Sequence, residues 1–177
     1  MNKTRFVVLI GMILTATASR LIPHPPNFTP LTAMALFGGA CFTDKRAAFL
    51  VPLVGLFLSD LILGFNALMP VVYGSFALTV CLGFWLCHQR STLQVTSATI
   101  AGAVLFFVLT NFGFWAFDSL YPKTLVGFAE CYALAIPFFW NTLLSSLLYS
   151  AILFGGLAFA ENRFTSLHKY HSVPSAA

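Results

Sequence analysis

Ionisable side chains are scarce in this chain, so each of them is a candidate for chemistry. The chain has 177 residues, of which only five are Asp or Glu and four are His. His24, Asp60, Asp118 and Glu130 are the residues that could assemble an acid–base or metal site. No nucleophile elbow, His-Glu-x-x-His motif, P-loop or glycine-rich dinucleotide loop accompanies them. The sequence therefore predicts a protein that is not an enzyme, and it indicates no cofactor.

A second set of residues favours the binding of a small molecule. Its members are isolated polar groups beside apolar and aromatic neighbours, which is the usual composition of a ligand site. Residues 111–141 are the richest stretch, with two of the three Trp residues. The predicted ligand-binding residues are His24, Asn27, Asp60, Tyr73, Asn111, Trp115, Asp118, Tyr121, Trp140 and Asn141. For the aromatic members, the alternative is a belt at the membrane–water boundary.

Asp60 lies inside an otherwise apolar segment, directly after Ser59. A carboxylate at membrane depth is costly and usually faces a cavity or a partner. The favoured interpretation is structural, with Ser59, a helix N-terminus or Arg20 as the partner. Contact with a ligand is the alternative.

Four cysteines lie in or beside apolar segments, and no CxxC pair signals a zinc site or a disulfide framework. Cys81 lies about 16 Å along its predicted helix from Pro70. A buried Cys is most often a small apolar filler. The alternative is a soft ligand to a transition metal, including the cobalt of a corrinoid. Under that hypothesis Tyr73, Ala77 and Cys81 share one helix face, with Cys81 at the floor of a cavity.

Composition identifies the elements that must position these residues. The chain is 59% hydrophobic and only 8% charged, against about 25% charged in soluble domains. We expect an integral membrane protein whose main partner is the lipid bilayer; its scattered basic residues do not indicate nucleic-acid binding. The expected fold is an all-α bundle of six transmembrane helices, at residues 6–18, 31–42, 47–65, 71–87, 96–117 and 138–160.

Three expectations concern the boundaries of this domain. Residues 1–163 are predicted to form the single transmembrane domain, and 164–177 a polar, disordered tail. Residues 125–136 are predicted to form a short helix that is broken by Pro137. The first segment also has the outline of a secretory signal, so its cleavage after residues 16–18 is an alternative to its remaining as a helix.

The distribution of basic residues predicts the orientation of the chain. With six spans and a cytoplasmic N-terminus, seven Lys and Arg residues lie inside and two outside. The inner ones are Lys3, Arg5, Lys45, Arg46, Arg90, Arg163 and Lys169, and the outer ones are Arg20 and Lys123. Both termini are therefore expected to be cytoplasmic, which gathers the polar loops of the predicted ligand site on the outer face.

Small residues recur along one face of the first segment, at Gly11, Thr15 and Ser19. Such a stripe lets a second helix approach closely in lipid. Packing against other helices of this chain is the favoured interpretation, and contact with a partner protein is the alternative.

Five motifs together resemble a known family. They are Arg-Leu-Ile-Pro-His-Pro-Pro-Asn-Phe-Thr-Pro (20–30), Leu-Ser-Asp-Leu-Ile-Leu-Gly-Phe (58–65), Val-Tyr-Gly-Ser-Phe (72–76), Asn-Phe-Gly-Phe-Trp (111–115) and Ala-Ile-Pro-Phe-Phe-Trp-Asn-Thr (135–142). These motifs resemble a family of small bacterial membrane proteins, which is in turn similar to the substrate-binding (S) components of energy-coupling-factor transporters.

The resemblance implies a six-helix bundle that captures a vitamin or metal ion near the outer face. It implies a site built from residues 23–30, 65–70 and 118–137, and docking on a transmembrane coupling subunit with ATPases through Gly11, Thr15 and Ser19. A solitary subgroup takes up vitamin B12 without ATPases and ligates its cobalt with a Cys, a position that Cys81 would match.

The expected function is that of a membrane transport protein in the bacterial cytoplasmic (inner) membrane. It would bind a small, vitamin-like nutrient, with cobalamin as one candidate, from the outer face. The alternative is a non-enzymatic structural or assembly protein that acts through helix–helix contacts.

Overall fold

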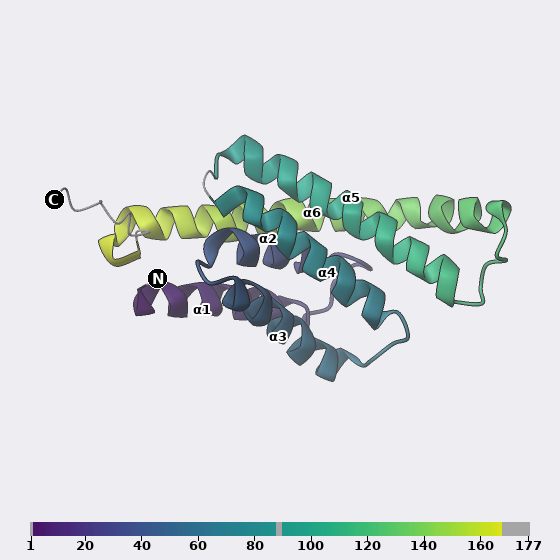
Figure 1. Ribbon diagram of the computed structural model, residues 1–177, viewed down its shortest axis with the longest axis horizontal. Coiled ribbons are helices and arrows are strands. Elements are labelled where there is room, and N and C mark those ends of the chain that lie inside the picture. Colours follow the sequence, from purple (N-terminus) through teal and green to yellow (C-terminus); the bar gives the residue numbers. More distant parts are fainter. Residues whose placement is uncertain (1, 88–89, 168–177) are drawn as a thin grey trace.

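The computed structural model describes residues 2–87 and 90–167, which form six α-helices and two short 3-10 helices (Figure 1). The elements are α1 (Lys3–Ser19), α2 (Leu31–Cys41), α3 (Lys45–Leu63), α4 (Met69–Phe84), η1 (Trp85–Cys87), α5 (Thr92–Phe117), α6 (Leu125–Arg163) and η2 (Thr165–Leu167). The described residues contain no strand, which confirms the predicted all-α class.

Four helical segments are long and apolar enough to cross a membrane, judged by length and composition. They are Lys45–Leu63, Met69–Cys87, Thr92–Phe117 and Leu125–Arg163. Large apolar side chains are exposed along all four, among them Leu61, Leu78, Val108 and Leu144. Contiguous apolar surface of this kind is expected where a protein meets lipid. These features suggest a membrane protein.

α2 lies at the centre of the bundle, where all eleven of its residues are buried. It packs against α3, α4, α5 and α6. Glycine makes this close packing possible: a Cβ atom on Gly39 would lie 2.1 Å from the carbonyl oxygen of Val80 in α4. A Cβ on Gly83 would in turn lie 2.5 Å from the carbonyl oxygen of Leu36. Small residues at both positions allow the backbones of α2 and α4 to touch.

α6 is one continuous helix of 39 residues that includes Pro137, so the predicted break at this proline is wrong. Proline removes one backbone hydrogen bond, but packing against neighbouring helices can hold a proline-containing helix together. The ring of Phe107 in α5 supplies such packing, because it contacts Tyr132 before the proline and Phe139 after it, at centroid distances of 5.7 and 4.9 Å. These contacts keep the two parts of α6 in line.

One end of the bundle, here called the terminal end, carries both termini of the described chain (Figure 1). Arg5 is only 2% exposed, and its Nη1 donates to Glu161 Oε1 at 2.6 Å and to the carbonyl oxygen of Leu167. Arg90 Nη2 lies 3.7 Å from the same carboxylate oxygen. The starts of α1 and α5 therefore meet the end of α6.

The first residues of the predicted disordered tail are ordered, which corrects that boundary. Residues 164–167 continue into η2, Leu167 is buried, and the Asn2 side chain donates to the Ser166 carbonyl at 2.8 Å. The Leu167 carbonyl accepts a hydrogen bond from the buried Arg5 side chain, which connects these residues to α1. Residues 168–177 of the predicted tail lie outside the described part of the chain.

The opposite end, here called the loop end, carries the connections 20–30, 64–68 and 118–124 (Figure 1). The α5–α6 hairpin extends beyond the other helices here. At 1.5 Å per residue, α6 is about 58 Å long, against about 30 Å for the hydrocarbon core of a bilayer. The loop end is where the bundle is hollow.

Candidate ligand-binding site

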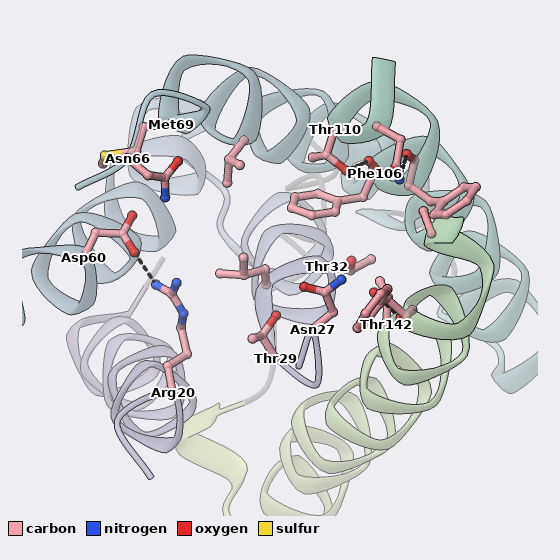
Figure 2. Close-up of a pocket in the computed structure, with 16 residues that line it drawn as sticks. Arg20, Asn27, Thr29, Thr32, Asp60, Asn66, Met69, Phe106, Thr110 and Thr142 are labelled. Carbon is pink, nitrogen blue, oxygen red and sulfur yellow. Dashed lines mark hydrogen bonds and ion pairs between the residues drawn. The ribbon is translucent and has the colours of Figure 1, made fainter. Parts of the chain in front are cut away.

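A cavity of about 310 Å³ lies at the loop end, between α1, α2, α3, α4, α5 and α6 (Figure 2). Small-molecule sites typically measure about 300–1,000 Å³, so this one suits a small ligand. Its polar lining residues are Arg20, Asn27, Thr29, Thr32, Asp60, Asn66, Thr110, Asn111 and Thr142, and its apolar ones are Leu31, Met69, Val72, Phe106, Phe107, Ala135 and Phe138.

The cavity exists because α2 is short. Its eleven residues extend about 17 Å, whereas the 26 residues of α5 extend about 39 Å. Leu31 and Thr32, in the first turn of α2, line the cavity. α5 and α6 continue past this turn towards the loop end, whereas the prolines in residues 23–30 prevent α2 from doing so. The space that further turns of α2 would fill is left open.

The proline-rich loop is folded over the cavity by a tight turn. The Phe28 N–H donates to the Pro25 carbonyl at 3.0 Å, and Asn27 has φ 62°. Proline followed by a residue of positive φ is the pattern of a type II turn, and Asn tolerates that backbone better than most residues. Asn141 of α6 fixes the turn, because its Nδ2 donates to the Pro26 carbonyl at 2.9 Å. Asn27 is thereby held at the cavity.

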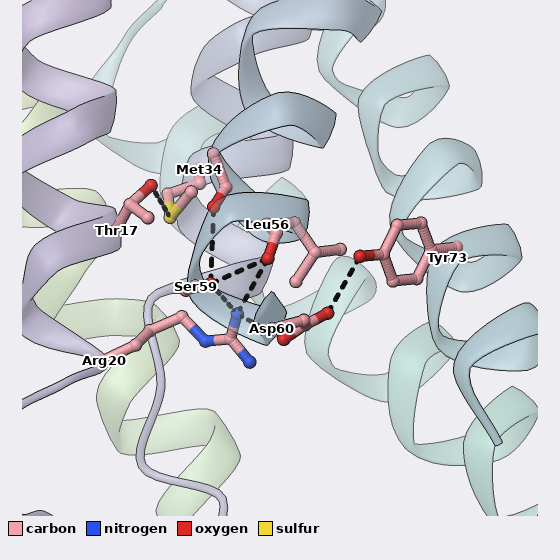
Figure 3. A network of polar contacts seen from close by, with 8 residues as sticks. Thr17, Arg20, Met34, Leu56, Ser59, Asp60 and Tyr73 are labelled. Carbon is pink, nitrogen blue, oxygen red and sulfur yellow. Dashed lines mark hydrogen bonds and ion pairs between the residues drawn. The ribbon is translucent and has the colours of Figure 1, made fainter. Parts of the chain in front are cut away.

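An ionic network forms the opposite wall (Figure 3). Arg20 Nη1 lies 2.9 Å from Asp60 Oδ1, and the Tyr73 hydroxyl donates to Asp60 Oδ2 at 2.9 Å. Arg20 Nη1 also donates to Ser59 Oγ. The Arg20 and Asp60 side chains are only 10% and 11% exposed. Arg20, one of the expected partners of Asp60, thus compensates its charge and ties α1 to α3, while Tyr73 adds α4.

Several polar groups at the cavity retain hydrogen-bonding capacity. The side chains of Asn27, Thr29 and Thr32 make no hydrogen bond to any other described residue. Asn111 Nδ2 donates to the Phe107 carbonyl at 2.8 Å, which leaves the amide oxygen of Asn111 available. Donors and acceptors beside the rings of Phe106 and Phe107 can orient a small polar ligand.

The structure brings half of the predicted ligand-binding residues to this site. Asn27, Asp60 and Asn111 line the cavity. Tyr73 and Asn141 do not line it, but they hold Asp60 and the proline-rich loop in place. In the described residues, no three His, Cys, Asp or Glu side chains lie close enough together to hold a metal ion.

The other five predicted residues do not line this cavity. His24 is exposed, with Nδ1 2.6 Å from the Ile22 carbonyl oxygen, and Trp140 is 57% exposed. Trp115 Nε1 donates to the Pro122 carbonyl at 3.1 Å. Asp118 Oδ1 accepts from the Leu120 N–H at 2.8 Å. Tyr121 packs against Phe114, with ring centroids 6.0 Å apart. None of these five side chains lines the cavity.

Some of the aromatic rings in residues 111–141 pack α5 against α6 and others contact neighbours within α6. Trp115 meets Phe128 at 5.3 Å, and Phe128 meets Tyr132 at 4.7 Å between ring centroids. Because α6 runs straight through Pro137, its first turns lie beyond the cavity, together with the end of α5. The sequence alone showed that residues 111–141 are rich in aromatic side chains. It did not show that this part of the α5–α6 hairpin extends beyond the other helices.

Cys81 does not line this cavity, which corrects its predicted position at a cavity floor. Val72 is the α4 residue that lines the cavity, and Cys81 follows it by nine residues. Nine residues are about two and a half turns, which places the two side chains on opposite faces of α4. Cys81 is exposed in an apolar surface groove with Ala77 of α4 and Phe112 of α5.

Sequence analysis missed several lining residues, of which Arg20 is the most informative because it was considered only as a partner of Asp60. Thr32, Thr110 and Thr142 also line the cavity, as do Thr29 and Asn66, which fall within the residue ranges that the resemblance implied but were not predicted individually. Each of them is polar and lies in or beside an apolar segment, which can indicate a binding site. For Thr this indication is weak, because its hydroxyl can hydrogen-bond to the backbone of its own helix.

The small-residue stripe of α1 faces outwards. Gly11 and Thr15 are exposed, and a Cβ on Gly11 would meet no other atom within 4 Å. With Ser19 they line a surface groove that is closed on its other side by Tyr149 and Ile152 of α6. The favoured interpretation, packing against helices of this chain, is therefore wrong for Gly11 and Thr15.

Comparisons with known proteins identify one family. The model of DUF6580, described as a family of unknown function, matches residues 1–168. No curated protein and no solved structure matches the chain.

Proposed function

We propose that this chain, which belongs to the DUF6580 family of unknown function, is a membrane transport protein that binds a small nutrient. The observation that carries the proposal is the cavity at the loop end, with nine polar side chains among its sixteen lining residues. Thr32 and Asp60 are buried, and polar groups buried beside an open space are costly unless water or a ligand satisfies them. A cavity in a membrane bundle that opens towards a loop end suits the capture of a solute.

The proposed orientation places the cavity at the outer face of the bacterial cytoplasmic membrane. Six described basic residues gather at the terminal end, namely Lys3, Arg5, Lys45, Arg46, Arg90 and Arg163, whereas Arg20 and Lys123 belong to the loop end. Cytoplasmic loops carry the excess of Lys and Arg, so both termini are cytoplasmic in this proposal. The bundle then forms one domain, in which α1 is a fifth lipid-facing span and α2 an internal sixth.

Cysteine labelling tests this orientation. Asn66→Cys at the loop end should react with a membrane-impermeant maleimide in intact cells. Arg163→Cys, at the end of α6, should react only after lysis. Wild-type protein, which keeps its four native cysteines, gives the background. The reverse pattern would place the cavity on the cytoplasmic side and exclude capture from outside.

A membrane partner is part of the same proposal. The exposed stripe of Gly11, Thr15 and Ser19 would let a second helix approach α1 closely. In a transporter that resembles S components, the second helix would belong to a coupling subunit with ATPases. The stripe equally favours the second candidate function, a structural or assembly protein that acts through helix contacts and has no small-molecule ligand.

Ligand binding separates the two candidate functions. Purified protein in detergent is screened by thermal unfolding against vitamins and other small nutrients, with Thr110→Phe as the variant that fills the cavity. The transport proposal expects at least one compound to raise the melting temperature of the wild-type protein but not of the variant. Stabilisation by none of them, together with a co-purifying membrane partner, would favour the structural role.

A further inference from the structure

We propose that the nutrient carries a carboxylate, which binds between Arg20 and the N-terminus of α2. This assignment of a substrate class depends on the proposed binding function and uses the same cavity. It rests on two independent sets of unused hydrogen-bond donors, one on a side chain and one on the backbone.

The first set is one edge of the Arg20 guanidinium. All the hydrogen bonds of this side chain, to Asp60, Ser59 and the Leu56 carbonyl, are made by Nη1. Nε is buried without a partner, and Nη2 makes no hydrogen bond to any described residue. Nε and Nη2 point in the same direction and form the fork that binds a carboxylate through two parallel hydrogen bonds. The fork belongs to a side chain that lines the cavity and is nine-tenths buried.

The second set is the first turn of α2. Pro30 is its N-cap residue, and no side chain caps the helix. The first backbone hydrogen bond at this end runs from the Met34 N–H to the Pro30 carbonyl, at 2.9 Å. The amide groups of Leu31, Thr32 and Ala33 therefore lack an acceptor among the described residues, although all three residues are buried. Buried amides at a helix start, where the helix dipole is positive, favour an anion.

The charge of Asp60 does not prevent a second carboxylate from binding. Arg20 Nη1 and the Tyr73 hydroxyl already satisfy its two oxygens, each at 2.9 Å. A ligand on the Nε–Nη2 fork would occupy a different edge of the guanidinium. Among the described residues that line the cavity, Arg20 and Asp60 are the only ionisable ones, and their formal charges cancel. The dipole of α2, worth about half a positive charge, makes the local balance favourable to an anion.

The other residues that line the cavity indicate which further groups the ligand carries. Figure 2 shows Asn27 and Thr29 across the cavity from Arg20. Asn27 offers both a donor and an acceptor, while the rings of Phe106 and Phe107 offer apolar surface. A volume of about 310 Å³ fits a small acid that also has an amide or hydroxyl group. Small acidic vitamins and amino-acid derivatives have this chemistry.

Pairs of compounds that differ only at the carboxylate test the proposal. Nicotinate with nicotinamide, pantothenate with panthenol, and biotin with biotin amide are titrated against purified protein while thermal unfolding is followed. Thiamine and pyridoxamine represent cationic nutrients. The variant is Arg20→Lys, which keeps the positive charge but removes the fork. Arg90→Lys, at the terminal end, is the matched control.

At least one acid should stabilise the wild-type protein, with its neutral counterpart at least about tenfold weaker. Loss of the charge-assisted pair of hydrogen bonds in Arg20→Lys should weaken binding of that acid about 10- to 100-fold, and Arg90→Lys should leave it unchanged. The comparison of acid with amide uses wild-type protein, so it stands even if Arg20→Lys fails to fold.

The remaining outcomes separate failure of the carboxylate assignment from failure of the proposed function. Equal binding of an acid and its amide, or stabilisation by neutral or cationic compounds alone, would overturn the carboxylate assignment while supporting ligand binding. Full binding of an acid by folded Arg20→Lys would also overturn it. Failure of every compound to stabilise the wild-type protein would contradict the proposed function, and this assignment with it.

Discussion

Asp60→Asn should destabilise the protein strongly, even though it hardly changes the size of the side chain. The substitution removes the negative charge 2.9 Å from Arg20 Nη1. An amide at this position could still accept one hydrogen bond from Arg20. The guanidinium would nevertheless keep its positive charge in a largely buried place, with neutral acceptors such as Ser59 Oγ and the Leu56 carbonyl but no counter-charge.

The expected size of the effect follows from burial. Removing one partner of a buried ion pair costs about 3–5 kcal/mol. The two side chains retain about one-tenth of their exposure and Arg20 keeps two acceptors, so we expect about 3 kcal/mol. In a chain of this length, each kcal/mol lowers the melting temperature by about 2–4 °C, which gives a decrease of about 6–12 °C. Tyr73→Phe, which removes one hydrogen bond to a charged acceptor, should cost about 1.5–3 kcal/mol.

Thermal unfolding of purified protein, followed by tryptophan fluorescence, measures these effects. Asp60→Asn and Tyr73→Phe together should cost less than the sum of the two, because both act on one hydrogen bond. Tyr132→Phe is the control, since its hydroxyl donates to the Val108 carbonyl and touches none of the network. Its effect should simply add to that of Asp60→Asn.

A second double variant tests the reason for the destabilisation. Replacing the pair by apolar residues, with Arg20→Met and Asp60→Leu in one chain, should recover part of the stability that Asp60→Asn loses, because no uncompensated charge is left. An Asp60→Asn protein as stable as the wild type would refute the network. So would an additive combination with Tyr73→Phe.

Gly39→Ala should lower the free energy of unfolding by about 1–3 kcal/mol in the same assay, because its Cβ would meet the α4 backbone at 2.1 Å; Gly155→Ala, with nothing within 4 Å, should not. Asn141→Ala should release the loop before α2 and speed its amide hydrogen exchange, at a cost of about 0.5–1.5 kcal/mol; unchanged exchange would contradict its anchoring role. Glu161→Gln leaves Arg5 without its counter-charge and should increase tryptic cleavage near the end of α6; equal cleavage would count against the contact.

The helices could be predicted from sequence because their signals are local. Long apolar runs separated by Pro, Asn and charged residues gave six segments, and the ends of the first five lie within four residues of the observed helices. The sixth helix begins at Leu125, well before the predicted start at residue 138. The broken helix at Pro137 was wrong for a non-local reason: Phe107, thirty residues earlier, packs on both sides of the proline. The low helix propensity of proline is a property of one segment, whereas the packing of Phe107 on α6 is a contact between two helices.

The candidate site could be predicted only in part. Asn27, Asp60 and Asn111 stood out because polar groups in apolar surroundings need a reason to be there. The direction in which Cys81 points depends on how α4 is rotated about its axis. The sequence of α4 does not determine this rotation, because the helix is apolar on both faces. The positions of Trp115 and Tyr121 outside the cavity depend on the length of the α5–α6 hairpin. That length follows from the unbroken α6.

Native mass spectrometry of the purified protein tests the central proposal, that a small molecule occupies the cavity. The protein is released from detergent after incubation with the acids, amides and cationic nutrients named above. Wild-type protein should retain one molecule of a single compound per chain. Thr110→Phe, which fills the cavity, should lose it, and Ala151→Phe, in a groove between α5 and α6, should keep it. Absence of any bound compound on the wild-type protein, or equal retention by Thr110→Phe, would contradict the proposal.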